Sequence, residues 1–488
     1  MAGEHDEYNS LLKDIFTRFP SVQNVPFSQA YKPGLEGMRA FDEALGFPSR
    51  SFRSIHVGGT NGKGSVANML ASALDACGYK TGLYTSPHIL DFRERARIGG
   101  RLIPKEYVYD FLTRWKPYFE EHGLSFFEIT TGLAFKWFAD EAVDAAVIEV
   151  GLGGRLDSTN IIIPELSIVT TIGLDHCALL GNSLAEIAAE KAGIFKPGVP
   201  ALVGEATPET LPVFASRASS SPLYLVKGAP LEPPSSLTPD VPVPPRSKCF
   251  SRKKKLEKHF SDSGRTSLCG KGAPSGVGQN FFDLFSGEKV LVHGGIIGAP
   301  GFEDLLKRMD LQAEVQRKNL ATVMAAVELL QGTFPRLKDA AAVEDGIAHT
   351  AERMGFHGRW ERLCGKPLVI ADIGHNAQAL ESNFRQIVKL GRPVIVYGIM
   401  ADKDLDAIIP LMPREASWIF TTPATKRALP ADEILRRCGM PDAQVVNPVT
   451  DAVRRALELA GATRPVYIGG STFVVAEALP CFGKEFEH

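Results

Sequence analysis

The stretch SIHVGGTNGKGSVANMLASAL, residues 54–74, decides the fold class. It begins with a short apolar run, continues through a glycine-rich loop that carries Lys63, and ends in a segment whose apolar residues recur with helical period. Glycines allow a ligand to approach the backbone closely, and the N–H groups at a helix N-terminus attract anions. A strand, a loop and a helix in this order therefore predict a loop that binds phosphate groups at the end of a buried strand.

The loop departs from the general phosphate-loop pattern at one position. That pattern places Ser or Thr directly after the lysine, whereas Gly64 stands between Lys63 and Ser65 here. A glycine-rich turn without a ligand is the alternative interpretation. We favour a nucleoside triphosphate, with Lys63 at its β- and γ-phosphates, because the strand, the loop and the helix follow one another in the required order.

Short apolar runs alternate with helical segments from residue 54 to residue 205, and again from residue 366 onward. Such alternation is typical of parallel strands joined by crossover helices. We predict an α/β protein with two domains: a P-loop-type doubly wound parallel-sheet ATPase domain over residues 1–355, and a smaller Rossmann-like α/β domain over residues 356–488. We take the segment near residue 356 as a hinge between the two domains.

Residues 226–280 differ in kind from the rest of the chain. They are rich in Pro, Ser, Gly and Lys and have few periodic apolar positions, so they cannot bury enough surface to offset their ordering entropy. We predict a disordered insertion or an anomalous segment here. Its basic run SRKKKLEKH could contact a polyanion, and a solvated loop is the alternative.

The overall composition excludes several classes of protein. The 488 residues carry 54 basic and 56 acidic side chains, a formal charge of -2, which gives no reason to expect nucleic acid or a membrane surface as a partner. The seven cysteines form no C-x-x-C pair, and the chain has neither a signal-peptide pattern nor a membrane-spanning apolar stretch. We expect a cytoplasmic monomer that acts on small molecules.

Three further motifs place polar residues where apolar runs end: TSPH at 85–88, IEVGLGGRLDSTN at 148–160 and TIGLDH at 171–176. The carboxylate of Glu149, the hydroxyl of Ser86 and the imidazole of His176 would together suit a divalent ion that bridges phosphates. A satisfied core histidine is the alternative for His176. The glycines of GLGG lack the spacing of a dinucleotide fingerprint, so we reject NAD.

Long ordered motifs resemble one known family over nearly the whole chain, except roughly residues 226–300. It is the folylpolyglutamate synthase and dihydrofolate synthase family of the Mur ligase superfamily, particularly its bifunctional bacterial members. Glycine after the lysine is that family's normal form. The motifs are HVGGTNGKGSV, TSPHILDFRERARI, FFEITTGLAF, IEVGLGGRLDSTN, GLDHCALLGNSLAEIAAEKAGIFKPG, VQRKNLATV, GRWERL and ADIGHNAQAL.

Matched position by position, the resemblance implies sites for ATP and Mg²⁺, with two magnesium sites. The residues implied for ATP are Thr60, Asn61, Gly62, Lys63, Gly64, Ser65, Asn319, Arg359, Asp372 and His375. The implied metal ligands are Ser86, Glu149, His176 and Lys191, of which Lys191 would be carbamylated near the second magnesium. The implied catalytic residues are Lys63, Glu149, His176 and Lys191.

Some of these roles have structural alternatives. Lys191 could contact phosphate directly as an unmodified ammonium. Arg359 could form a hinge ion pair, while Asp372 and His375 could cap the end of a strand.

The resemblance also implies a pteroyl pocket. The residues that match its lining are Ser125, Phe126, Phe127, Glu128, Leu156, Asp157 and Ser158. An aromatic ring such as Phe127 suits stacking on a pterin, and the Asp157 carboxylate suits the pterin nitrogens. Phe126 and Phe127 could equally be plain core residues.

The activity that the resemblance implies is an ATP-dependent ligation. A pteroyl carboxylate, from dihydropteroate or a reduced folate, would be phosphorylated and then attacked by the amine of L-glutamate. One alternative is a Mur-type peptidoglycan precursor ligase, which normally needs more chain before its phosphate loop. The other is a nucleotide-binding scaffold that has lost catalysis, against which the intact set of polar residues argues.

Overall fold

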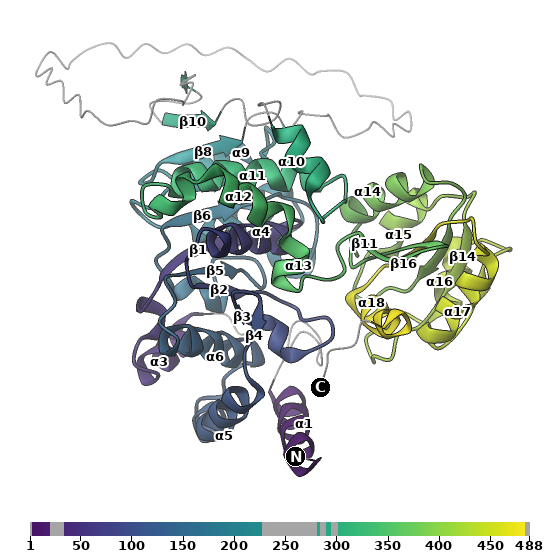
Figure 1. The fold of residues 1–488 in the computed structure, drawn as a ribbon, viewed down its shortest axis with the longest axis horizontal. Helices are drawn as coiled ribbons and strands as arrows, with labels where there is room; N and C mark the ends of the chain where they lie inside the picture. Colours follow the sequence, from purple (N-terminus) through teal and green to yellow (C-terminus); the bar gives the residue numbers. More distant parts are fainter. Residues whose placement is uncertain (1, 20–33, 227–280, 284–288, 294–300, 484–488) are drawn as a thin grey trace, which may run out of the picture.

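The computed structural model describes residues 2–19, 34–226, 281–283, 289–293 and 301–483. These residues form two sheets, one of ten strands and one of six. The larger sheet and its helices come from the chain before residue 356, and the smaller sheet follows that residue (Figure 1). The boundary near residue 356 stays a prediction.

The larger sheet has the order β4-β3-β2-β5-β1-β6-β7-β8-β10-β9. Its central strands run parallel, and among the described strands the antiparallel pairs, β2 with β3, β3 with β4 and β10 with β9, lie at the two edges. Helices cover both faces of a parallel sheet, which explains why β1 and β5 are buried along nearly their whole length. The strands are β1 (Arg53–Gly58), β2 (Thr81–Tyr84), β3 (Ala96–Ile98), β4 (Arg101–Leu102), β5 (Ala145–Glu149), β6 (Leu166–Val169), β7 (Ala201–Val203), β8 (Leu223–Val226), β9 (Phe281–Asp283) and β10 (Lys289–His293).

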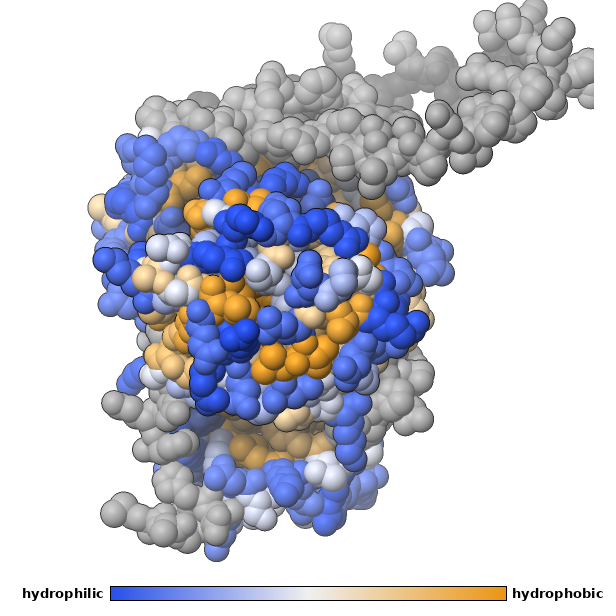
Figure 2. Space-filling model, turned by 90° about the vertical axis from the view of Figure 1, so that its right-hand side faces the viewer, coloured by the Kyte–Doolittle hydropathy of each residue, from blue (hydrophilic) through white to orange (hydrophobic). Residues whose placement is uncertain are grey.

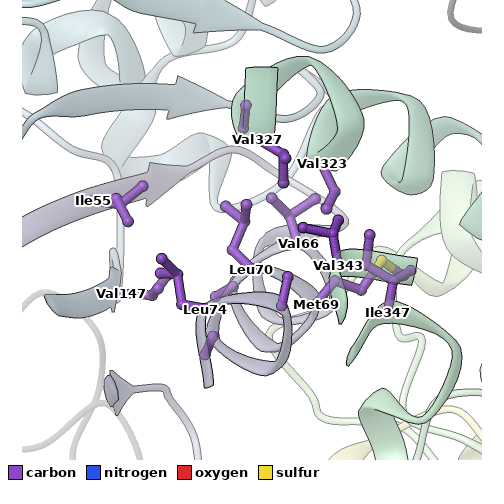
Figure 3. Packing of buried hydrophobic residues seen from close by; sticks show 14 of the residues in the cluster. Ile55, Val66, Met69, Leu70, Leu74, Val147, Val323, Val327, Val343 and Ile347 are labelled. Carbon is purple, nitrogen blue, oxygen red and sulfur yellow. The ribbon is translucent and has the colours of Figure 1, made fainter. Parts of the chain in front are cut away.

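Helix α4 (Lys63–Ala76) follows the glycine-rich loop and is buried nearly all round, between the sheet on one side and α11 and α12 on the other. Figure 3 shows Leu70 and Val66 of α4 among side chains of β1, β5, α11 and α12. The helices of this part are α1 (Ala2–Arg18), α3 (Glu36–Ala44), α4, α5 (Lys105–His122), α6 (Phe126–Asp140), α7 (Cys177–Leu180), α8 (Leu184–Lys191), α9 (Leu211–Arg217), α10 (Phe302–Arg308), α11 (Gln316–Leu330), α12 (Ala340–Ala348) and α13 (Thr350–Met354). Burial on every side holds the start of α4, and so the loop before it, in a fixed position.

The smaller sheet has the order β11-β12-β16-β13-β14-β15, and all of its pairs are parallel except β11 with β12. Its strands are β11 (Glu361–Gly365), β12 (Leu368–Asp372), β13 (Val394–Tyr397), β14 (Ser417–Phe420), β15 (Gln444–Val445) and β16 (Val466–Gly469). Its helices are α14 (Ala377–Val388), α15 (Leu405–Ile408), α16 (Ala431–Cys438), α17 (Val449–Ala460) and α18 (Thr472–Ala478). The expected α/β class with two parallel-dominated sheets is confirmed.

The face turned toward the viewer in Figure 2, on the side of the smaller sheet, is mostly hydrophilic, with hydrophobic residues in patches between the polar ones. No helix in the described part of the chain is long and apolar enough to cross a membrane. The insertion predicted over residues 226–280 lies outside the described residues, apart from Val226 at the end of β8.

Candidate functional site

A cleft of about 1010 Å³ is lined by residues from both sheets and their loops. It contains every residue predicted for ATP and for the metal, so the structure brings together side chains that are up to 315 positions apart in the chain. Those residues are Thr60, Asn61, Gly62, Lys63, Gly64, Ser65, Ser86, Glu149, His176, Lys191, Asn319, Arg359, Asp372 and His375.

The glycine-rich loop has the conformation that its sequence requires. Gly62 precedes α4 with a φ of 88°, and a Cβ at this position would overlap the side chain of Asn319. No side chain caps α4, so the first backbone N–H groups of the helix remain available to an anionic ligand. Thr60 fastens the loop to the neighbouring strand end, because its Oγ1 donates to the Gly173 carbonyl at 3.1 Å.

Lys191, which is buried, and Lys63, which is partly exposed, meet at one carbonyl group. Lys63 Nζ donates to the Gly59 carbonyl at 3.1 Å, and Lys191 Nζ donates to the same oxygen at 2.9 Å. Burial lowers the pKa of both lysines, and the charge of Lys63 adds to this effect at Lys191, whose pKa falls to about 7. Two lysine side chains held this close favour an anion beside them, which is the electrostatic character expected of a phosphate site.

Glu149 ends β5 beside the loop that carries Ser86. Its Oε2 accepts the backbone N–H of Ser86 at 3.1 Å. Burial raises the pKa of Glu149, and the nearby Lys63 opposes this effect. The carboxylate therefore has a cation on one side, and it would be stabilised further by a divalent ion.

His176 lies at the end of the GLDH motif with a φ of 54°, an uncommon conformation for a residue other than glycine. Burial, partly offset by Asp175, lowers its pKa to about 3. The imidazole is therefore neutral and able to act as a metal ligand. Within the described ranges, no group of three or more His, Cys, Asp and Glu side chains is arranged to hold a metal, so this site would also use the hydroxyl of Ser86 and ligand oxygens.

The second sheet contributes Arg359, Asp372 and His375 to the same cleft. A guanidinium nitrogen of Arg359 lies 3.4 Å from where a Cβ of Gly64 would stand, so the arginine faces the start of α4. Asp372 ends β12 and accepts the backbone N–H groups of Trp360 at 2.9 Å and Gly374 at 2.7 Å. It therefore caps the strand end while it also lines the cleft.

The residues predicted for the pteroyl group lie outside the lining of this cleft. Ser125 and Glu128 form a capping box at the start of α6, in which the Glu128 carboxylate accepts the Ser125 backbone N–H at 2.7 Å. Phe126 is buried in the core, and its ring centroid lies 4.5 Å from that of Phe16. Phe127 packs against Gly151, where a Cβ would overlap its ring.

The stretch of residues 156–158 lies beside the turn at residues 151–154, which contains Gly151. Asp157 is buried, accepts the backbone N–H of Leu152 at 2.8 Å and caps the short helical turn that begins at Ser158. Leu156 and Ser158 are partly exposed. Phe127 and Asp157 thus contact the cleft-lining turn, although neither lines the cleft.

Sequence reasoning missed four polar residues that join the two parts of the site: Asp175, Asn376, Gln378 and Lys403. Asp175 Oδ1 accepts from Lys403 Nζ at 2.8 Å. Burial alone would raise the pKa of Asp175, but the hydrogen bond from His375 and the charge of Lys403 hold it well below its ordinary value. The positions of Asp175 and Asn376 inside the GLDH and GHN motifs were the only available signal, since nothing in the sequence pairs either residue with a partner.

Comparison with known proteins identifies the family. Two protein-family models match the chain: the Mur ligase middle domain over residues 57–203 and the Mur ligase glutamate ligase domain over residues 358–472. The folylpolyglutamate synthase of Lacticaseibacillus casei is 30% identical over 451 residues, which span 88% of this chain and 93% of that protein. The chain belongs to the folylpolyglutamate synthase/dihydrofolate synthase family of Mur ligases.

Other members of this family agree along most of the chain. The dihydrofolate synthase/folylpolyglutamate synthase of Mycobacterium tuberculosis is 30% identical over 431 residues, covering 83% of this chain and 78% of that protein. A solved structure of M. tuberculosis folylpolyglutamate synthase, complexed with ADP and AMPPCP, superposes with a TM-score of 0.73 at 25% identity and covers 99% of both chains. The family resemblance predicted from the motifs is confirmed.

Proposed function

We propose that this protein is an ATP-dependent ligase that joins L-glutamate to a pteroyl substrate, dihydropteroate or a reduced folate, through an acyl phosphate. The observation that carries the proposal is the cleft between the two sheets. In it, Lys63 and Lys191 at a phosphate loop line one cleft with Glu149, His176 and, from the second part of the chain, Arg359. Family membership fixes the reaction class, and the cleft supplies groups suited to phosphoryl transfer.

ATP would bind with its phosphates on the glycine-rich loop. The free N–H groups of α4 and the ammonium of Lys63 suit the β- and γ-phosphates. Asn319, beside Gly62 of the loop, and Arg359 and His375, from the second part of the chain, would contact the rest of the nucleotide. The M. tuberculosis relative was solved with ADP and AMPPCP, which supports this assignment.

The donor set beside the loop fits magnesium. Glu149 offers a carboxylate, Ser86 a hydroxyl and His176 a neutral imidazole. When bound, the ion would neutralise charge on the phosphate oxygens and so make the γ-phosphorus more open to nucleophilic attack.

Lys191 would be carbamylated and provide an anionic oxygen for a second magnesium. Its pKa of about 7 leaves a large fraction of neutral amine at physiological pH. A neutral amine can attack CO₂, form the N–C bond and release one proton, whereas an ammonium cannot. Carbon-13 NMR of the protein in labelled bicarbonate would test the modification, and wild-type and Lys191→Met spectra without a difference would contradict it.

In the reaction the pteroyl carboxylate attacks the γ-phosphorus in line, and Lys63 neutralises the charge that develops on the transferred group. The glutamate amine then attacks the acyl phosphate, and inorganic phosphate leaves. Because no side chain forms a covalent bond with the substrate, catalysis depends on positioning and on electrostatic stabilisation. Closure of the two domains would keep water from the labile intermediate.

The pteroyl group would lie beside the turn at residues 151–154, which both Phe127 and Asp157 contact. We further propose the domain division 1–355 and 356–488, supported by the separate sheets and by the two family models that match on either side of residue 356. We also propose that the protein is a cytoplasmic monomer. Light scattering on the purified protein would test its monomeric state.

The deciding experiment measures ATP consumption with glutamate plus either dihydropteroate or tetrahydrofolate, each offered separately. We expect turnover that requires both glutamate and a pteroyl compound, and the two arms separate one ligase activity from two. Folded protein that hydrolyses no ATP in either arm would contradict the proposal and favour an inactive nucleotide-binding scaffold. Turnover with a UDP-linked peptidoglycan precursor instead would favour a peptidoglycan ligase.

A further inference from the structure

Lys403 reaches from the second sheet to the first. It lies in the loop between β13 and α15, and its Nζ is 2.8 Å from Oδ1 of Asp175, in the loop after β6. The two side chains are only 10% and 12% exposed. A second ion pair across the same boundary, Lys389 with Glu314, has side chains that are 58% and 44% exposed. Such an exposed pair contributes little, whereas the buried pair is sensitive to the loss of either partner.

The Asp175 carboxylate also holds the backbone of the next residue. Its Oδ1, which accepts from Lys403, accepts the backbone N–H of His176 at 2.9 Å as well. Its Oδ2 accepts from Asn376 Nδ2 at 3.3 Å and lies 3.7 Å from His375 Nε2. One carboxylate therefore links three residues of the second sheet to the backbone of His176.

This link matters because the His176 backbone is strained. Its left-handed φ of 54° costs energy in a residue other than glycine and persists only where the surroundings hold it. The neighbouring Leu174 side chain is largely exposed, so packing fixes this loop only in part. The His176 carbonyl accepts the backbone N–H groups of Leu179 and Leu180 in α7. The hydrogen bond from the His176 N–H to Asp175, with Lys403 behind it, adds a constraint that comes from the second sheet.

We propose that Lys403 is a positioning residue that couples domain closure to the orientation of His176. When the two sheets lie as they do here, Lys403 fixes the Asp175 carboxylate, and the carboxylate fixes the loop at residues 171–176. When the domains separate, this constraint is lost and His176 is no longer held toward the cleft. The proposed ligand site at Ser86, Glu149 and His176 is thus complete only in the closed arrangement.

The kinetic test of this inference rests on the proposed function. The test variant is Lys403→Met, which removes the charge while keeping the length of the side chain. We expect kcat to fall on the order of tenfold to a hundredfold, with a higher Mg²⁺ concentration needed for half-maximal rate and little change in KM for glutamate. Lys403→Arg keeps the charge and should restore part of the rate. Lys389→Met removes the exposed cross-domain pair and should behave as wild type.

A second readout does not need turnover. Small-angle X-ray scattering of the protein without ligands should give a larger radius of gyration for Lys403→Met than for wild type or Lys389→Met. Calorimetric titration with ADP should show a stronger dependence on Mg²⁺ in Lys403→Met. Both measurements can be made even if wild type shows no glutamate-dependent turnover. That absence of turnover would contradict the proposed function, whereas the role of Lys403 would still be tested by scattering and calorimetry.

Two outcomes would overturn the positioning role while leaving the proposed function intact. One is a Lys403→Met protein with the kcat, Mg²⁺ dependence and radius of gyration of wild type. The other is a loss of rate that follows only the loss of folded protein, with an unchanged Mg²⁺ dependence per folded molecule and no rescue by Lys403→Arg.

Discussion

Lys191 allows the electrostatics of the cleft to be tested by a stability measurement. The residue is only 4% exposed, and its Nζ donates to the Gly59 carbonyl. Burial, assisted by the charge of Lys63, lowers its pKa from 10.5 to about 7. In the unfolded chain the same ammonium is solvated and keeps its ordinary pKa. Between these two pKa values, therefore, the unfolded state binds more protons than the folded state.

The sign and size of the effect follow from this difference. Stability rises with pH wherever the unfolded state binds more protons, with a slope of about 1.4 kcal/mol per pH unit for one full proton. About half of Lys191 is still protonated in the folded protein at pH 7, so the slope starts at half this value. From pH 7 to pH 9 the contribution of Lys191 to the free energy of unfolding should increase by about 2 kcal/mol. Well below pH 7 both states are protonated and the contribution becomes constant.

The assay is urea unfolding of wild type and Lys191→Met at pH 7 and pH 9, in buffer free of bicarbonate and nucleotide. Wild type should gain about 2 kcal/mol over the variant between the two pH values. Lys307→Met is the matched control, because the Lys307 side chain is 77% exposed and the variant should follow wild type. If wild type and Lys191→Met show parallel pH dependences, the ammonium of Lys191 is not destabilised by burial, and the reasoning fails.

Three further substitutions test the catalytic group, the core and a cap. Lys63→Ala should lower kcat at least about a hundredfold without a large change in thermal unfolding, because it removes the charge beside the transferred phosphate. Leu70→Ala should lower the free energy of unfolding by about 3 kcal/mol in urea titrations, because the side chain is 1% exposed in the core around α4. Ser125→Ala should cost about 1 kcal/mol through the lost cap of α6 and leave KM for the pteroyl substrate unchanged.

For each of these substitutions, one result would contradict the reasoning. A strong loss of thermal stability in Lys63→Ala would mark that lysine as structural. Leu390→Ala, at a leucine that is 48% exposed, should change stability little, so equal effects at Leu70 and Leu390 would contradict the burial argument. A raised KM in Ser125→Ala with unchanged stability would place Ser125 in contact with the pteroyl group instead of serving only as a cap.

The sequence alone determined the parts of this protein that local chemistry controls. Glycine at position 62 was required because the loop turns through a positive φ before α4, and only a residue without a side chain fits beside Asn319. The alternation of strands and helices predicted parallel sheets, because the apolar periodicity of each segment reflects its own burial. The polar residues that follow the strands were visible for the same reason, and Glu149 and His176 both line the cleft.

Only the tertiary structure decided which of these segments meet. The sheet places β5 between β2 and β1 and places β6 on the other side of β1, an order that brings Ser86, Glu149 and His176 to one edge although the chain visits these strands in another sequence. The structure also showed Ser125 and Glu128 as a capping box and Asp372 as the cap of a strand end. A side-chain oxygen that could bind a ligand can equally accept a hydrogen bond from a backbone N–H group. The residue type is the same in both roles, so the sequence does not distinguish them.

The pairing of Asp175 with Lys403 is the clearest case of information absent from the sequence. The two residues are 228 positions apart, and each lies in a loop without periodicity. Their contact depends on how the two sheets and their loops pack against each other, and that packing is set by the shapes of both surfaces rather than by either segment. The sequence therefore determined the phosphate loop and the reaction class, whereas the arrangement that joins the two halves of the site arises only when the whole chain is folded.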